Sequence, residues 1–135
     1  MIGIDTNILL RWLLDESISD DDAPHQTALV SAHILDGKET CFANAVVVAE
    51  TLWVLAHPMK QPKAVLVDIV ERLLASFNVE VSEPQAVHVA LDAYRTGNAG
   101  FVDYLIGEIN AKAGCTTTLT FDKKAAKSER FTLLN

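Results

Sequence analysis

The chain has 135 residues, half of which are hydrophobic, and its 18 acidic against 11 basic residues give a formal net charge of −7. This length fits one domain with a real core, and the apolar content excludes an intrinsically disordered chain. An acidic chain repels nucleic acid at long range unless its basic side chains cluster or a cation intervenes, and the same charge suits a basic protein partner.

The first part of the chain predicts one strand and two helices. Residues 1–4 are apolar and predict a short buried strand, and apolar residues at helical spacing over 8–13 predict a helix directly after it. Residues 19–22 form an acidic turn. Pro24 stands where the N-terminus of a second helix is expected, and Gly37 ends that helix.

The middle of the chain predicts two strands that flank two helices. Residues 40–43 predict a short strand. Residues 45–55 contain three consecutive valines, which favour a strand, but the run is long and its apolar residues share one helical face, so we predict a helix. A His-Pro pair ends it. An amphipathic helix over 63–76 and an alternating strand over 77–81 follow.

The last part of the chain predicts two helices and then two strands. Pro84 opens a helix that ends near Gly97, and the residues 101–113 predict another helix. β-branched residues over 116–121 predict the fourth strand of the chain. Residues 131–134 predict a last edge strand.

Strands that alternate with helices predict an α/β fold, with a central, mainly parallel sheet of four to five strands covered by helices on both faces. Right-handed crossovers bring the carboxyl ends of parallel strands to one edge of the sheet, where a site is expected. Asp5 ends the first predicted strand and Asp122 follows the fourth. We therefore expect these two carboxylates at the same sheet edge.

Four carboxylates interrupt segments that are otherwise apolar or small: Asp5, Glu50, Asp103 and Asp122. Each has an ordinary structural explanation, namely a helix cap, a solvent-facing helix position, a favourable helix dipole and a turn, in that order. If the four converge, a hard divalent cation such as Mg²⁺ or Mn²⁺ relieves their mutual repulsion. Such a cation can activate water and neutralise charge on a phosphoryl group.

Four segments of the chain carry a family resemblance. They are IDTNILLRWLL, AE, GFVDYLIGEINAKAGC and TLTFDKKAAK. In this order and spacing they resemble the PIN-domain family, and within it the VapC-type toxins of bacterial toxin–antitoxin pairs. The resemblance covers essentially the whole chain. It implies a single domain over residues 1–135, an α/β/α sandwich, and an Mg²⁺-dependent endoribonuclease that also accepts Mn²⁺.

The resemblance also implies roles for individual residues, because the acidic positions of the family match the four carboxylates. Asp5 and Asp103 correspond to metal ligands and Asp122 completes the site, while Glu50 is either a ligand or the general base. One metal ion or two would both suit the chemistry. Polar positions of the family that hold carboxylates by hydrogen bonds match Asn7, Thr120 and Thr6.

Basic residues cluster beside the last of these acids. Lys123, Lys124 and Lys127 either belong to a solvated C-terminal helix or contact the RNA backbone near the metal without reading its sequence. Single-stranded or looped RNA is the expected substrate class, because its bases are exposed. Trp12 and Trp53 lie at apolar helical positions, which favours core packing over base stacking for both.

Two other classes of function compete with a nuclease. A non-catalytic binding module on the same fold would bind metal and a protein partner without cleaving RNA. A phosphoryl-transfer domain of the haloacid-dehalogenase type requires a second aspartate two residues after Asp5, where Asn7 stands. A domain of the receiver type requires adjacent acids near the start, which the segment MIGID lacks.

The sequence also predicts compartment and partners. Cys41 and Cys115 lack metal-ligand spacing and indicate a reducing cytoplasm, and neither a signal peptide nor a membrane helix is indicated. Surplus apolar surface on the predicted helices over 45–55 and 63–76, together with the resemblance, predicts a homodimer. The resemblance further implies an antitoxin whose basic or apolar tail inhibits the nuclease, and an arginine of that tail could enter the acidic cleft.

Overall fold

A computed structural model of the protein describes residues 1–14, 23–35 and 38–135. The chain forms two compact units, Met1–Ser82 (unit 1) and Glu83–Asn135 (unit 2). The acidic turn predicted at 19–22 and the helix end predicted at Gly37 lie outside the described residues.

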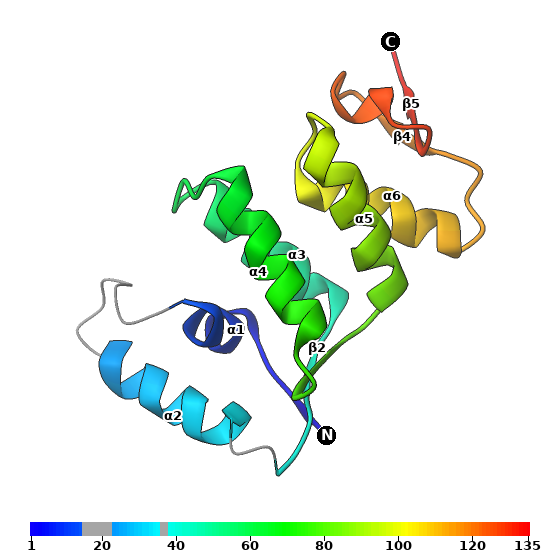
Figure 1. Ribbon diagram of the computed structural model, residues 1–135. Helices are drawn as coiled ribbons and strands as arrows, with labels where there is room; N and C mark the ends of the chain where they lie inside the picture. Colours follow the sequence, from blue (N-terminus) through cyan, green and yellow to red (C-terminus); the bar gives the residue numbers. More distant parts are fainter. Residues whose placement is uncertain (15–22, 36–37) are drawn as a thin grey trace. The chain divides into compact units, whose positions relative to one another are not determined.

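Unit 1 is a small parallel sheet with helices between its strands (Figure 1). The strand order is β1-β2-β3, so β2 lies in the middle, and both of its pairings are parallel. Helix α1 packs against both α2 and α3, and α3 packs against α4. The elements in chain order are β1 (Ile2–Gly3), α1 (Thr6–Leu13), α2 (Ala23–Leu35), β2 (Cys41–Ala43), α3 (Ala45–Ala56), α4 (Lys63–Ala75) and β3 (Val79–Val81).

The valine-rich segment of unit 1 is a helix, as the long shared apolar face predicted. Asn44 caps α3, because its side-chain oxygen accepts a hydrogen bond of 3.0 Å from the backbone amide of Val47. Burial outweighs the β-propensity of the valines, since one face of the helix lies in the core. The fully buried side chains of α3 are Val48, Thr51, Leu52 and Leu55.

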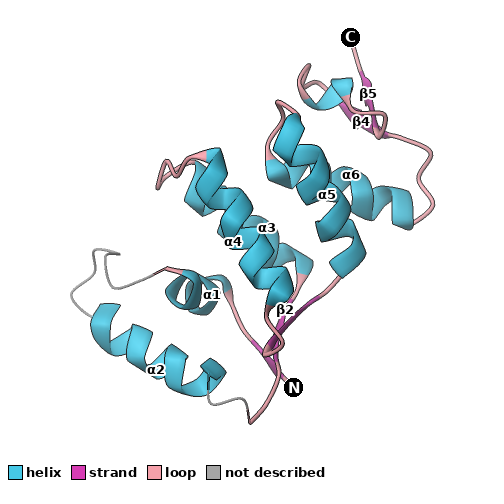
Figure 2. Cartoon of the chain, in the orientation of Figure 1, coloured by secondary structure: helices cyan, strands magenta, loops and turns pink. Residues whose placement is uncertain are grey.

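Unit 2 pairs two helices with a second, two-stranded sheet (Figure 2). Helices α5 and α6 pack against each other, and the ring of Tyr94 meets that of Phe101 edge-on at 5.9 Å. Burial raises the pKa of Tyr94 above its ordinary value. Strands β4 and β5 run parallel. The elements are α5 (Pro84–Thr96), α6 (Phe101–Lys112), β4 (Thr118–Thr120), the 3₁₀ turn η1 (Ala125–Lys127) and β5 (Phe131–Leu133).

Two glycines of unit 2 allow close approach between elements. A Cβ on Gly97 would overlap the hydroxyl of Tyr104, which accepts a hydrogen bond of 3.2 Å from the backbone amide of Ala99. A Cβ on Gly107 would lie 2.7 Å from the ring of Phe131. Space, and not backbone conformation, therefore requires glycine at both positions.

The α/β fold class with parallel strands, which the sequence predicted, is confirmed. Every predicted helix and strand is present, with boundaries that differ by a few residues. The described strands divide into a sheet of three in unit 1 and a sheet of two in unit 2. No helix among the described residues has the length and apolarity needed to span a bilayer.

Candidate functional site

Asp5 occupies the junction between β1 and α1 in unit 1. Its Oδ1 accepts a hydrogen bond of 3.0 Å from the backbone amide of Ile8, so the side chain caps α1. Because β1 runs parallel to β2, Asp5 lies at the same carboxyl edge as Asn44, the cap of α3. Thr6 is half-buried in the first turn of α1 and Asn7 is exposed beside it. This is the edge at which α/β sheets bind their ligands.

Glu50 lies on the solvent-exposed side of α3, also in unit 1. It shares that side with Val46, Trp53 and His57, which are exposed as well. These positions are seven and four residues apart in the helix, so their side chains form one stripe. The prediction that Trp53 packs in the core is wrong, because half of its surface is exposed. Trp12 is only partly buried.

Asp103 belongs to the first turn of α6 in unit 2. Gly100 is the N-cap residue of that helix, and its carbonyl accepts a hydrogen bond of 3.1 Å from the backbone amide of Asp103. The half-buried carboxylate thus lies at the positive end of the helix dipole, which stabilises its charged form. A Cβ at Gly100 would lie 3.4 Å from Oδ2 of Asp103, so small residues surround this carboxylate on its N-terminal side.

Asp122 lies in the tight turn that leaves β4 in unit 2. Its Oδ1 accepts hydrogen bonds from the backbone amides of Lys124, at 2.8 Å, and Ala125, at 3.4 Å. The hydroxyl oxygen of Thr120 accepts a hydrogen bond of 3.0 Å from the backbone amide of Asp122. Thr120 therefore holds the turn through the main chain and does not touch the carboxylate. Lys123, Lys124 and Lys127 are all exposed along this turn and η1.

The four carboxylates are divided equally between the units, with Asp5 and Glu50 in unit 1 and Asp103 and Asp122 in unit 2. Within the described residues of each unit, no three His, Cys, Asp or Glu side chains gather into a metal site. Asp5 and Asp122 each use Oδ1 for capping, and among the described residues no hydrogen bond reaches their second oxygen. Exposed carboxylate oxygens of this kind are the donors that Mg²⁺ and Mn²⁺ prefer.

Comparison with protein families decides what this set of acids belongs to. The model of the PIN domain matches residues 2–130, which span both units and all four carboxylates. The chain belongs to the PIN-domain family. A search of curated proteins finds no match.

Membership in the PIN-domain family sets the broad class of activity. The PIN domain is a nuclease-type fold, and its members are generally nucleases that use divalent metals. Nucleic acid is accordingly the substrate class that the family indicates for this chain. The resemblance read from the four sequence segments is confirmed at the level of the family.

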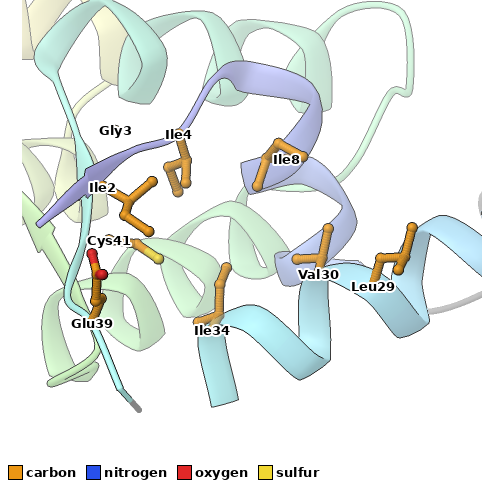
Figure 3. Close-up of a pocket in the computed structure, with 9 residues that line it drawn as sticks. All are labelled: Ile2, Gly3, Ile4, Ile8, Leu29, Val30, Ile34, Glu39 and Cys41. Carbon is orange, nitrogen blue, oxygen red and sulfur yellow. The ribbon is translucent and has the colours of Figure 1, made fainter. Parts of the chain in front are cut away.

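Unit 1 of this PIN domain also contains an apolar groove that sequence reasoning missed. It has a volume of 370 Å³ and lies between β1, α1 and α2, with Ile34 directed toward the side occupied by Ile4 and Cys41 (Figure 3). A second hollow of 430 Å³ shares Ile8 and two α2 residues with it and is lined by Asp5, Asn7, Arg11 and Gln26. The only signal in the sequence was the presence of more aliphatic residues than one helix face needs.

Proposed function

We propose that this PIN domain is a metal-dependent endoribonuclease and the toxin of a toxin–antitoxin pair. The observation that carries the proposal is the family match over residues 2–130, which includes four carboxylates in otherwise apolar or small-residue settings. In the proposal, Asp5, Glu50, Asp103 and Asp122 act together as one site that holds Mg²⁺, with Mn²⁺ as a substitute. The two units then function as a single domain over residues 1–135.

The roles of the residues follow from their chemistry. Asp5 and Asp103 contribute carboxylate oxygens to the cation, and Asp122 completes its coordination. When bound, the cation supplies an activated water and neutralises charge on the phosphate. Glu50 either joins the ligands or accepts the proton of the attacking water as general base. Hydrolysis then leaves a 5′-phosphate and a 3′-hydroxyl, the products that the family resemblance implies.

Neighbouring polar and basic residues have supporting roles. Thr6 and Asn7 follow Asp5 directly, and Thr120 holds the backbone that carries Asp122, so all three orient carboxylates. The exposed lysines of the Asp122 turn, Lys123, Lys124 and Lys127, contact phosphates of the RNA strand without reading its sequence. These cations offset part of the repulsion between an acidic protein and a polyanion.

The antitoxin is proposed to occupy the apolar groove of unit 1. Two observations favour an apolar segment that carries a basic residue. The aliphatic lining suits an apolar helix or extended peptide. Glu39 lines the groove at the β2 side, and Asp5 lines the adjoining hollow, so acidic groups flank the apolar surface. Five of the 18 acidic residues lie in residues 15–22, directly before α2, and favour the same basic partner.

An Asp5→Asn variant tests the nuclease directly. Asparagine caps helices as well as aspartate does, so the variant keeps the hydrogen bond to Ile8 while losing the charge that a cation requires. We expect the purified parent to cleave single-stranded RNA with Mg²⁺ or Mn²⁺ and to stop with chelator. Asp5→Asn should lower the cleavage rate by more than about 100-fold.

An Asp68→Asn variant is the matched control, because Asp68 is an exposed carboxylate on α4. It should cleave as fast as the parent. Equal cleavage by Asp5→Asn and the parent would contradict the proposal. A parent that binds Mn²⁺ but cleaves no RNA would instead favour the non-catalytic binding module.

A further inference from the structure

The exposed stripe of α3 carries an aromatic pair next to a proposed catalytic acid. Glu50 is followed by Trp53 and His57 on the same side of the helix, with Val46 before them. Val46 has 72% of its surface exposed and Trp53 has 50%. A half-exposed tryptophan is unusual in a chain with enough apolar residues to bury it, so its position calls for a function.

The Trp53 ring is supported from one side. The ring centroids of Trp53 and His57 are 5.1 Å apart with an interplanar angle of 41°, so the imidazole packs against the indole. His57 is itself fixed at the C-cap of α3, where its backbone amide donates a hydrogen bond of 2.9 Å to the carbonyl of Trp53. The indole is thereby restrained, and stacking on its exposed surface costs less conformational entropy.

Trp53 lies close to Glu50 along the helix. Three residues separate them, which corresponds to a rise of about 4.5 Å on one face. We propose that Trp53, supported by His57, stacks on an unpaired base of the RNA strand next to the nucleotide that reaches Glu50. The inference rests on the proposed nuclease function and adds a substrate contact to it. Proteins that bind single strands use exposed aromatic rings in this way, without sequence preference.

A protein interface is the competing use of the same stripe. Tryptophan is common at interface centres, but charged residues are depleted there. Glu50 stands between Val46 and Trp53, so a dry contact would bury its carboxylate unless a partner charge compensated it. An RNA strand whose phosphates share a cation with Glu50 meets no such penalty. A stacked base is therefore the better occupant for this stripe.

The test combines protein variants with abasic substrates. The main cleavage position of a single-stranded RNA is first mapped with the parent, and abasic nucleotides are then placed singly at the flanking positions. At one position the abasic substitution should raise KM for the parent and have no further effect on Trp53→Leu, because the same contact is already missing. Trp53→Leu should lower kcat/KM on the intact RNA by roughly 10-fold or more, mainly through KM.

Matched variants separate stacking from bulk and from folding. Trp53→Phe keeps an aromatic face and should retain most of the activity, whereas Trp53→Leu keeps only apolar volume. Val46→Ala changes the same stripe on the other side of Glu50 and should behave like the parent. Unchanged thermal unfolding of the three variants would show that the differences arise at the RNA contact.

Two results would overturn the inference while leaving the nuclease intact. One is equal kcat/KM for the parent and Trp53→Leu on every RNA. The other is normal cleavage by Trp53→Leu combined with a change from dimer to monomer in sedimentation, which would assign the stripe to contact between copies. A parent that cleaves no RNA would remove the proposed function as well, so the two failures are distinguishable.

Discussion

Asp5 shows how one side chain can combine a structural and a chemical role. The sequence left open whether it caps α1 or binds a cation, and the structure has it capping the helix through Oδ1. A carboxylate has about four lone-pair sites, so this hydrogen bond uses only part of its capacity. Asp122 resembles it, since its Oδ1 accepts two backbone amides in the turn after β4. Capping holds each carboxylate in one orientation, which favours metal binding by preorganisation.

Thr51 offers a stability prediction at the scale of one residue. It is fully buried in α3, and its hydroxyl finds no hydrogen-bond partner among the described residues. A buried unpaired hydroxyl is destabilising, so Thr51→Val should raise the free energy of unfolding by about 1 kcal/mol. Thermal or denaturant unfolding measures the change. Thr51→Ser keeps the hydroxyl, loses a methyl group and should lower stability. A less stable Thr51→Val would refute this account.

Among the elements, α3 combines the most functions. Its buried side supplies Val48, Leu52 and Leu55 to the core of unit 1, and its exposed side carries Glu50 and Trp53. The sequence predicted a helix here but not which of its sides is covered, because nearly every position of the segment is apolar. Neighbouring elements decide that question, and α1 and α4 both pack against α3.

The junction of α5 and α6 gives a prediction at the scale of elements. Gly97 has an extended backbone that alanine can adopt, but a Cβ there would overlap the Tyr104 hydroxyl and lie 2.9 Å from the carbonyl of Ala93. Gly97→Ala should therefore lower the free energy of unfolding by about 1–3 kcal/mol, as overpacking does. Chemical denaturation provides the measurement.

Gly3→Ala is the control for that variant, because a Cβ at Gly3 would meet nothing within 4 Å. Its stability should stay close to that of the parent. If Gly97→Ala were as stable as Gly3→Ala, the close approach of Tyr104 to the backbone would not be a constraint on the fold.

For the whole molecule, charge distribution determines the kind of partner. The net charge of −7 arises to a large extent around α2, since residues 15–22 hold five acids and no base. The exposed lysines near Asp122 provide the opposite charge along one turn of unit 2. An acidic groove region suits a basic inhibitor, and a local basic turn suits RNA phosphates. Both partners are thus compatible with one acidic chain.

The antitoxin complex yields the prediction for the whole molecule. Raising salt from about 0.1 M to about 1 M shortens the Debye length from ~10 Å to ~3 Å, so the affinity should fall, and an antitoxin arm of reversed charge should fail to inhibit. Leu29→Lys, which adds a positive charge at the groove, should weaken binding further. Calorimetry measures each affinity.

Val89→Lys is the control for the groove, because Val89 is an exposed aliphatic residue on α5. It should bind the antitoxin as the parent does. Equal affinities for Leu29→Lys and Val89→Lys would remove the groove as the docking surface, while a complex insensitive to salt would remove the electrostatic part of the argument.

The sequence by itself determined the helices and strands, the parallel α/β class and the family, because hydrophobic period, capping residues and ordered motifs are local properties of the chain. Only the tertiary structure decided that Trp53 is exposed, that Thr120 bonds the backbone of Asp122, and that a groove lies beside α2. These features depend on neighbours distant in sequence. A periodic pattern reveals that a helix has an apolar face, but only packing determines which part of that face is covered.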